Sequence, residues 1–514
     1  MAKISTDNPV KRVFVNTLFL YIKMIVTTLL SLYTTRLILQ ILGVDDFGLY
    51  NLLAGIIVLL SFLNAAMMQV TQRFLSVHMG RDNIESVKMI FNNGIVLHLF
   101  FACVIVVVLE IGTLFLFNNG LNIPFNRVGI AKHIYQLMIL MVVITIISAP
   151  YNAVINARED LWFFAIVEVI VSIFKLFSTL FLCYFETNYL ALYTYFMLIA
   201  TLLGAGIKIF WSYRQYPEVR LNIFRYCKKS TIKDMLSFCG WNTLGAMGQV
   251  GRTQGTAIVL NTFGGVAINA AYGIANQVNS LLVYFSQMMT TSIAPQIMKA
   301  KGENDVKKML YLSVLTSKLS FYLSSLFAVP IVLELPFILH LWLGEVPEYT
   351  IPFCYYIMCI FLLLQLYPGL IRLLQADGHI KYLQIFISFF LLLPIPLGSI
   401  LLYKNYSIYT LFDIMVIAQI ATLISTLFLS KKYVGLNVLR YLLDVILKPI
   451  LILGISFALC KQFCFVHNEY VRCVLIMLLN ICVLTGLFYH FVLDSTEQKK
   501  VKTILNHKKC LLPD

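Results

Sequence analysis

The amino-acid sequence predicts an all-α, polytopic membrane protein. Of its 514 residues, 60% are hydrophobic and only 12% are charged, and the mean hydropathy is +0.84. Soluble chains carry about 25% charged and 45–50% apolar residues. A water-soluble domain of this length would therefore expose large apolar patches. The abundance of aromatic and apolar residues also excludes a disordered chain.

The apolar runs are long enough for about fourteen membrane-spanning helices, because one crossing needs about 20 mostly apolar residues. In the first half of the chain the helices are predicted near residues 13–35, 48–70, 94–117, 134–155, 161–184 and 189–212. In the second half they are predicted near 234–261, 268–294, 310–332, 351–374, 380–403, 407–430, 440–460 and 470–493. The first run follows Lys11 and Arg12 without a cleavage pattern, so we expect a retained helix. Twelve spans remain an alternative.

These helices divide into two lobes and an extension. We expect a first lobe of six helices over 1–212, a basic cytoplasmic linker over 213–233 and a second six-helix lobe over 234–430. Residues 431–514 would add two helices and a basic cytoplasmic tail. The division rests on the linker, which is the longest connection on its side of the membrane.

Similar short motifs occur in the same order in the two halves of the sequence. Asn16-Thr17-Leu18 matches Asn242-Thr243-Leu244, and Tyr50 precedes Arg73 by the 23 residues that separate Tyr272 from Pro295. Matches of this kind recur at offsets of 226, 222 and 219 residues. Six helices return the chain to its starting side, so the lobes would be parallel repeats, as in transporters with a site near the bilayer midplane. Chance similarity between apolar helices is the alternative.

Basic residues indicate the orientation. Of the 39 Lys and Arg residues, 28 fall in segments on one side of these helices and six on the other, and five lie within the helices. Because cytoplasmic loops are enriched in Lys and Arg, we expect both termini in the cytoplasm. This topology and anionic lipid account for the net charge of +15, so no nucleic-acid partner is expected.

No motif indicates catalysis. The sequence contains no GxxxxGK[ST], HExxH or GxSxG pattern. The 11 cysteines lack paired spacing, which argues against a disulfide framework or a metal site. We therefore expect no enzyme, no catalytic residue and no cofactor.

Polar residues inside apolar helices are the candidates for function, because a charge at the bilayer centre costs about 2.5–3.5 kcal/mol. In the first helix, Asn16, Lys23, Thr27 and Thr34 fall on one line of the helix surface. This stripe predicts either a cavity wall that meets an anion or a helix contact with a paired lysine. In the seventh helix, Asn242 and Gln249 share a face flanked by Arg252, and four glycines nearby predict close packing.

Other charged residues complete the predicted site. Glu168 and Lys175 are too far apart to pair along one helix, so they would bind separate partners, a substrate or a buried network. The cations expected to bind substrate are Lys23, Arg252, Lys175, Lys318, Arg36 and Arg73. The expected cavity lining is Asn16, Thr27, Asn242 and Gln249, and the possible ion-coupling acids are Glu168 and Asp413. Interface anchoring is the alternative for Arg36, Arg73 and Asp413. Asp444 and Lys448 should pair with each other.

Several motifs resemble those of a known family. They are Thr35-Arg36-Leu37, Leu42-Gly43-Val44-Asp45-Asp46-Phe47-Gly48-Leu49-Tyr50, Gln72-Arg73-Phe74, Pro150-Tyr151-Asn152-Ala153, Ala271-Tyr272-Gly273-Ile274-Ala275-Asn276-Gln277-Val278 and Leu341-Trp342-Leu343-Gly344. In this order they resemble the Wzx-type polysaccharide flippases, which handle O-antigen and capsule units, of the multidrug/oligosaccharidyl-lipid/polysaccharide (MOP) exporter superfamily. The resemblance covers roughly residues 13–430.

The resemblance implies a transporter in the bacterial inner membrane whose two lobes surround a central cavity. Its substrate would be a polyprenyl-pyrophosphate-linked oligosaccharide, moved from the cytoplasmic to the periplasmic leaflet by alternating access. Lys23 and Arg252 stand on the two helices that line the cavity in the family. We expect a monomer in contact with membrane lipid, with polysaccharide polymerase or assembly proteins as possible partners. The rival interpretations are a multidrug/cation antiporter of the same superfamily and a membrane enzyme of polysaccharide assembly.

Overall fold

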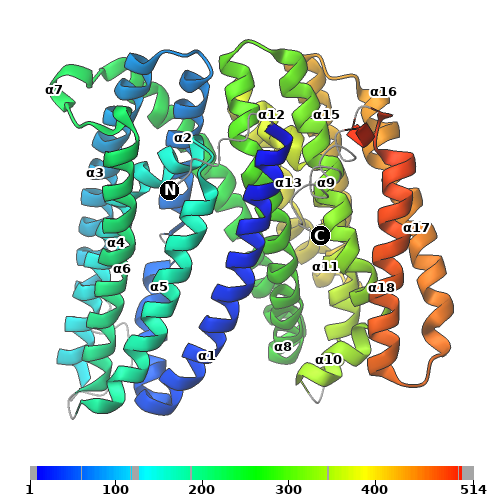
Figure 1. The fold of residues 1–514 in the computed structure, drawn as a ribbon. Helices are drawn as coiled ribbons and strands as arrows, with labels where there is room; N and C mark the ends of the chain where they lie inside the picture. The colour runs from blue at the N-terminus through cyan, green and yellow to red at the C-terminus, as the bar shows by residue number, and fades with distance from the viewer. Residues whose placement is uncertain are drawn as a thin grey trace, which may run out of the picture. The chain divides into compact units, whose positions relative to one another are not determined.

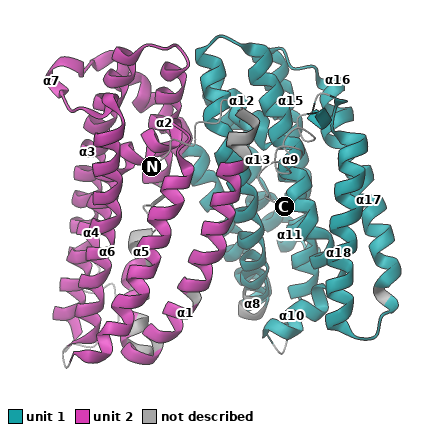
Figure 2. Cartoon of the chain, in the orientation of Figure 1, with its two compact units in different colours: residues 1–13, 244–514 teal, residues 14–243 magenta. Residues whose placement is uncertain are grey.

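The chain is helical throughout the part that the structure describes (Figure 1). A computed structural model describes residues 9–58, 61–115, 117, 127–185, 188–343, 346–495 and 497–499, and no strand occurs among them. The chain separates into two compact units (Figure 2). The N-unit comprises residues 14–243, and the C-unit comprises residues 244–514 together with the first 13.

The N-unit contains most of α1 (Pro9–Val58), α2 (Ser61–Met79), α3 (Ile84–Phe115), α4 (Val128–Ala157), α5 (Leu161–Phe181) and α6 (Tyr189–Gln215). The short helix η3 (Leu182–Tyr184) follows α5, and the short helices η4 (Pro217–Val219) and α7 (Ile223–Tyr226) lie between α6 and α8. Helix α4 packs against α2, α3 and α6. The hydrophobic core of the unit includes the buried side chains of Ile134, Tyr135 and Met138, which belong to α4 itself.

The C-unit begins within α8 (Lys229–Gly302) and continues with α9 (Val306–Leu333), α10 (Leu335–Leu343), α11 (Thr350–Gln365), α12 (Pro368–Asp377), α13 (Ile380–Leu392), α14 (Pro394–Tyr403) and α15 (Tyr409–Val434). Proline has no backbone N–H and is favoured at the first turn of a helix. Pro368 and Pro394 accordingly open α12 and α14, and α11 bends by 44° into α12.

The last helices form the extension that the sequence predicts. They are α16 (Val438–Tyr441), the π-helical turn η5 (Leu442–Leu447), α17 (Lys448–Lys461), η6 (Gln462–Phe465), α18 (Glu469–Leu487) and η7 (Phe488–Val492). Both α17 and α18 pack against α9 through apolar clusters that include Ile452, Leu484 and Cys460. The predicted pair also forms, with Lys448 Nζ 2.6 Å from Asp444 Oδ1.

By length and hydropathy alone, ten of the described helices could cross a membrane, or eleven if α11 and α12 form one bent span. The other predicted spans, near 48–70, 234–261 and 268–294, fall in α1–α2 and in α8, where polar residues lower the hydropathy. The prediction ended the second span too early. Helix α2 continues to Met79 because Thr71 and Gln72 are buried inside the unit.

Helix α3 likewise begins ten residues earlier than predicted, at Ile84. Its asparagines, Asn92 and Asn93, are fully buried and hold the segment that follows α6. Asn92 Oδ1 accepts a hydrogen bond from Asn222 N at 2.8 Å, and Asn93 Oδ1 accepts one from Lys228 N at 3.0 Å. Both asparagines also donate to backbone carbonyls of that segment, so polar contacts extend the helix beyond its apolar run.

Backbone geometry supports the internal repeat. Gly43 (φ 74°, ψ 172°) breaks α1, and Gly265 (φ 79°, ψ −177°) breaks α8, 222 residues later. Asp82 (φ 51°) and Asn304 (φ 56°) follow at the same offset. Glu159 (φ 64°) and Gly378 (φ 98°) form a third pair, 219 residues apart. Left-handed residues are uncommon, so their recurrence at the predicted offsets favours a repeat over chance.

The glycines of α8 serve helix packing, as the sequence predicts. Gly245, Gly248 and Gly251 approach Gln384, Ser388 and Leu392 of α13. A Cβ atom at Gly248 would lie 3.1 Å from Ser388 Cα, a tight contact that would push α13 away by a few tenths of an ångström. Ser388 Oγ also donates to Leu244 O across 3.2 Å. The absence of side chains on this face therefore lets α13 lie directly against α8.

Candidate functional site

The N-unit gathers three lysines around one glutamate. Phe164, Glu168 and Lys175 share a face of α5, since they are separated by four and seven residues. Helix α6 packs against α5 and brings Lys208 to this face. Lys208 Nζ donates to Glu168 Oε1 across 2.5 Å. Lys23 of α1 and Lys175 both lie near enough to interact electrostatically with Glu168.

Two of these cations lie near the same aromatic ring. Lys208 Nζ lies 4.7 Å from the centroid of the Phe164 ring, and Lys23 Nζ lies 5.1 Å from it. The negative face of an aromatic ring attracts ammonium groups. With three ammonium groups and one carboxylate, the cluster carries a net positive charge in its ionised form. We call Lys23, Phe164, Glu168, Lys175 and Lys208 the lysine cluster.

The position of Lys208 corrects the sequence analysis, which counted it among the 28 Lys and Arg residues of the cytoplasmic segments and not among the five within helices. The residue lies within α6, and its side chain is buried. The helix continues past the predicted end at residue 212 to Gln215. Near this end Trp211 packs on Phe163 of α5, with the ring centroids 4.3 Å apart. Lys208 is therefore another charged residue within an apolar helix. It pairs with Glu168, for which the sequence analysis identified no partner.

Other predicted residues of the N-unit have local partners. Thr27 Oγ1 donates to Lys23 O within its own helix, at 2.8 Å. Asn16 is 2% exposed and donates to Glu159 O at 2.8 Å, so it joins α1 to the turn between α4 and α5. Arg36 is exposed on α1. The Arg73 guanidinium lies 5.0 Å from the ring of Phe74 and 4.5 Å from that of Phe238.

The C-unit contains a polar cavity of about 290 Å³. Its polar lining comes from both parts of α8, from Tyr367 in the bend between α11 and α12, and from α15. It consists of Gln249, Arg252, Tyr272, Asn276, Asn279, Gln287, Tyr367, Gln419 and Thr422. Apolar residues of α11 and α13 complete the wall. No carboxylate occurs among the described residues that line it. We call this the arginine cavity.

Arg252 is the cation of this cavity. Its Nε atom is buried and has no hydrogen-bond partner among the described residues. Tyr272 and Tyr367 are near enough to interact with it electrostatically, and Gln419 Nε2 donates to Tyr367 Oη across 2.5 Å. A buried donor without a partner is unfavourable, so the cavity is suited to an acceptor, such as a carboxylate, phosphate or sugar oxygen.

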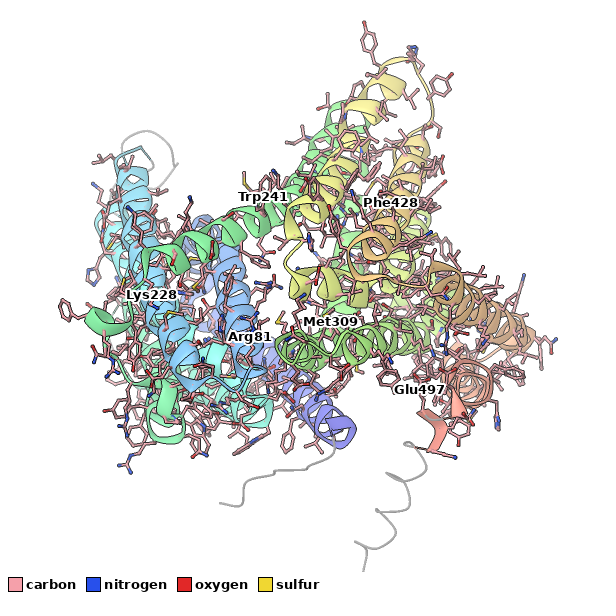
Figure 3. The ribbon with its side chains drawn as sticks, turned by 90° about the horizontal axis from the view of Figure 1, so that it is seen from above. Arg81, Lys228, Trp241, Met309, Phe428 and Glu497 are labelled. Atoms are coloured by element: carbon pink, nitrogen blue, oxygen red, sulfur yellow. The ribbon has the colours of Figure 1, made fainter. Side chains whose placement is uncertain are left out.

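Three predicted residues lie elsewhere. Asn242 is buried in the first part of α8, within the N-unit. Lys318 of α9 is 1% exposed and donates to Glu497 Oε2 at 3.3 Å and to Val492 O at 3.1 Å, which makes it part of a buried ion pair. Glu497 lies beyond η7, at the edge of the C-unit (Figure 3). Asp413 accepts a hydrogen bond from Tyr356 at 2.9 Å on an exposed surface.

Some residues of these sites were missed by the sequence analysis. Asn276, Asn279 and Gln287 occupy one face of α8, and their helical spacing after Tyr272 was a usable signal. Gln419 and Thr422 of α15 gave a similar signal in an apolar helix. Within the described residues, no group of three His, Cys, Asp or Glu side chains could hold a metal ion.

Comparison of structures identifies the fold. A crystal structure of MATE in the bent conformation is similar to this chain with a TM-score of 0.74 at 15% identity, and the match covers 83% of this chain and 95% of that one. The outward-facing structure of a multidrug resistance MATE family transporter of the MOP superfamily gives 0.72 at 16% identity, covering 84% and 97%. The chain has the fold of these transporters.

A third solved structure bears on the polarity of the site. It is a MOP superfamily transporter from Pyrococcus furiosus, and it is described by the reverse polarity of its binding pocket. The transporter matches this chain with a TM-score of 0.71 at 16% identity, and the match covers 83% of this chain and 96% of that one. No protein-family model matches the sequence, and no curated protein matches it significantly. The MATE-like fold with two lobes, in a multi-pass membrane protein, agrees with the fold class predicted from the sequence.

Proposed function

We propose that this protein is a flippase for polyprenyl-pyrophosphate-linked oligosaccharides. It would move repeat units of O-antigen or capsule from the cytoplasmic to the periplasmic leaflet of a bacterial inner membrane by alternating access. In this proposal both termini are cytoplasmic, which is the orientation favoured by the distribution of Lys and Arg. The protein would bind and release its substrate without chemical change.

The charge of the two sites is the observation that carries the proposal. The lysine cluster holds three cations around one acid, and the arginine cavity holds a cation without a carboxylate among its described lining residues. Cations in a low-dielectric setting attract anions far more strongly than they do in water. A diphosphate-linked lipid, with or without acidic sugars, supplies the complementary charge.

The two sites offer different chemistry to such a substrate. The ammonium groups of Lys23, Lys175 and Lys208 are point charges that suit a diphosphate. The amide side chains and tyrosines of the arginine cavity can exchange hydrogen bonds with sugar hydroxyls. The Arg252 guanidinium can meet an acidic group through two parallel hydrogen bonds. Each site is thus suited by its own chemistry, the lysine cluster to a diphosphate and the arginine cavity to sugar.

Pocket polarity also separates functions among proteins of this fold. For the Pyrococcus furiosus transporter, a reversed polarity of the binding pocket suggested a different function. In this chain the cations of the two sites, Lys23, Lys175, Lys208 and Arg252, outnumber the one acid, Glu168. An exporter of cationic compounds would benefit from the opposite balance.

The second candidate function is multidrug/cation antiport. It is favoured by one observation, the similarity to a multidrug resistance MATE family transporter, whose fold this chain shares. Glu168 and Asp413 would then be the candidates for ion coupling. The two functions differ in the charge of the transported molecule, which makes them separable by experiment.

The decisive experiment measures movement of a fluorescent polyprenyl-pyrophosphate oligosaccharide across proteoliposome membranes. We expect the wild type to move the lipid and Lys23→Ala and Arg252→Ala to fail although they insert normally. Lys448→Ala is the matched control, because Lys448 pairs with Asp444 on η5, outside both sites. If the wild type instead moves no lipid and extrudes a cationic dye when an ion gradient drives it, the flippase assignment is wrong.

A further inference from the structure

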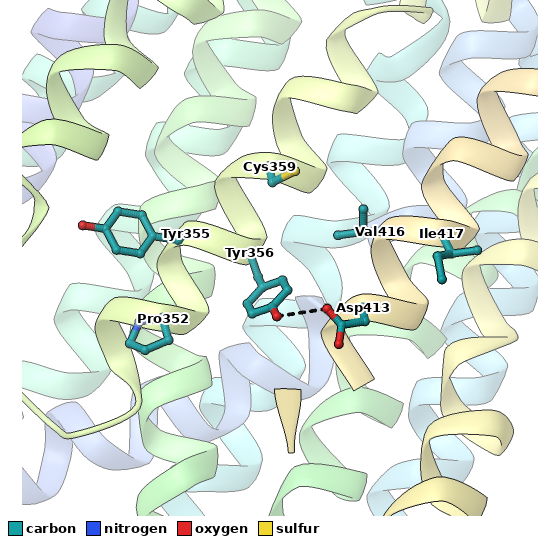
Figure 4. A pocket seen from close by; sticks show the side chains of 7 residues that line it. All are labelled: Pro352, Tyr355, Tyr356, Cys359, Asp413, Val416 and Ile417. Carbon is teal, nitrogen blue, oxygen red and sulfur yellow. Dashed lines mark hydrogen bonds between the residues drawn. The ribbon is translucent and has the colours of Figure 1, made fainter. Parts of the chain in front are cut away.

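We propose that the groove between α11 and α15 binds a phospholipid whose headgroup carries a primary ammonium, as in phosphatidylethanolamine. The groove has a volume of about 560 Å³ and lies wholly within the C-unit. Pro352, Tyr355, Tyr356 and Cys359 line it from α11, and Asp413, Val416 and Ile417 line it from α15 (Figure 4). This site is separate from the arginine cavity and does not depend on the proposed transport function.

A carboxylate without a cation marks one end of the groove. Tyr356 and Asp413 face each other across it, and Tyr356 Oη donates to Asp413 Oδ1 at 2.9 Å (Figure 4). No Lys, Arg or His among the described residues forms an ion pair with Asp413, and the residue is exposed. A carboxylate at a lipid-facing surface is unfavourable unless a counter-ion or water reaches it.

The surroundings of Asp413 have the composition that is typical of the interfacial zone of a membrane protein. The residue is four positions after the start of α15 at Tyr409, or about 6 Å along the helix axis. The Tyr409 ring stacks on Tyr356 and lies beside Tyr349, with the centroids of both pairs 6.2 Å apart. Tyrosines gather where a membrane protein meets the headgroups, so Asp413 lies where an ammonium headgroup is found.

An apolar surface continues from Asp413 toward the middle of the helix. Ile417 is 64% exposed, and Ile420 and Ile424 follow it on the exposed side of α15. From Asp413 to Ile424 the helix rises about 16 Å, which matches one leaflet of a hydrocarbon core about 30 Å thick. One lipid can therefore place its headgroup at Asp413 and an acyl chain along Val416, Ile417 and Ile424.

The chemistry of the groove selects among headgroups. A primary ammonium donates hydrogen bonds to both Asp413 oxygens and to the Tyr356 hydroxyl, which accepts while it donates to Asp413. A choline headgroup has the same charge but no N–H donor. A glycerol headgroup leaves the phosphate charge uncompensated and would be repelled by Asp413. The expected order of affinity is phosphatidylethanolamine, then phosphatidylcholine, then phosphatidylglycerol.

Native mass spectrometry of the full chain, titrated with these three lipids, tests the proposal. For wild type we expect phosphatidylethanolamine to be retained about two- to five-fold more than phosphatidylglycerol, as for one partly exposed ion pair. Asp413→Asn should remove this preference, Asp413→Glu should keep it, and Asp413→Lys should favour phosphatidylglycerol. Glu110→Gln is the matched control, because Glu110 accepts from Gln136 at 3.1 Å in the N-unit.

Three results would overturn the assignment. The first is an unchanged preference in a folded Asp413→Asn variant, which would mean that the carboxylate does not contact the headgroup. The second is an unchanged preference together with a loss of ion-driven transport, which would make Asp413 a coupling residue instead. A loss of preference in Glu110→Gln as well would show a general charge effect and would also contradict a site at the groove.

Discussion

Lys208 on α6 and Glu168 on α5 form an ion pair at 2.5 Å within the N-unit, and the ammonium groups of Lys208 and Lys23 both lie near the Phe164 ring. The pair holds Glu168 in place while two further lysines remain near it. A negatively charged substrate could compete with Glu168 for these ammonium groups. The pair therefore combines a structural role with the proposed binding role, and the two can be separated by mutation.

We predict that Lys208→Met weakens both folding and transport, because it leaves Glu168 without its closest partner. Since the Glu168 side chain is 32% exposed, we expect a loss of about 1–2 kcal/mol. The double variant Lys208→Met/Glu168→Gln should regain the melting temperature in detergent but not the transport of an anionic lipid. Full transport by the double variant would contradict a role of the cluster in binding.

The breaks in α1 and α8 lead to a second prediction. The backbone of Gly265 has φ 79° and ψ −177°, a region that is open to glycine only. Nothing lies within 4 Å of a Cβ atom built on Gly265, so the effect of Gly265→Ala comes from the backbone alone. We expect a loss of about 1–3 kcal/mol in the free energy of unfolding.

Gly273→Ala is the control for Gly265→Ala. It lies in the same helix, and its added Cβ also meets nothing within 4 Å, but its backbone is helical. Alanine is the better helix former, so this variant should be neutral or slightly stabilised. Equal thermal stability of the two variants would show that the break at Gly265 carries no strain. The corresponding pair in α1 and α4 is Gly43→Ala and Gly129→Ala.

The fold class and several candidate residues could be predicted because hydropathy and isolated charges are local properties of the sequence. Lys23 and Arg252 stand out in apolar helices, and the structure places each in a polar site. Lys208 could not be recognised in this way, because it lies near the end of an apolar run, where a lysine is ordinarily a loop residue. Its assignment required the contact with Glu168 from another helix.

Helix ends were predicted poorly for a related reason. The sequence analysis ended helices where polar residues begin, but Thr71, Asn92 and Asn93 are buried by contacts distant in sequence. The arginine cavity was found only in part, since it combines residues from α8, α12 and α15. Each of these features depends on tertiary packing, which a pattern within one helix does not contain.

A third prediction concerns the turn that follows α6. Tyr216 Oη donates to Asp160 Oδ2 at 2.6 Å, and Tyr216 is buried. Tyr216→Phe should lower the free energy of unfolding by about 1–3 kcal/mol, because Asp160 loses a buried donor. Tyr213→Phe is the matched control, since Tyr213 is 64% exposed three residues earlier. Thermal unfolding in detergent measures both.

The contact between Tyr216 and Asp160 also predicts that the stability of the protein depends on pH. Burial, and then the charge of Asp160, raise the pKa of Tyr216 above its ordinary value. The folded protein therefore keeps this proton at a pH where the unfolded chain, with a pKa of about 10, begins to release it. The stabilisation is complete below that pH and is lost as the pH rises toward the folded pKa. The difference in melting temperature between wild type and Tyr216→Phe should shrink above about pH 10.

The last prediction concerns the buried pair of Lys318 and Glu497. It tests whether Lys318 is a structural cation or a substrate-binding one. Their side chains are 2% and 5% exposed, and Lys318 Nζ also donates to Val492 O. Lys318→Met should destabilise the protein by about 3–5 kcal/mol, since it leaves a buried carboxylate unpaired. Glu497→Gln keeps an oxygen that can accept from Asp494 N, so the double variant Lys318→Met/Glu497→Gln should fold nearly as well as wild type. It should also transport the lipid-linked oligosaccharide at close to the wild-type rate, unlike Arg252→Ala. A folded double variant that cannot transport would indicate that Lys318 binds substrate, as the sequence analysis predicts.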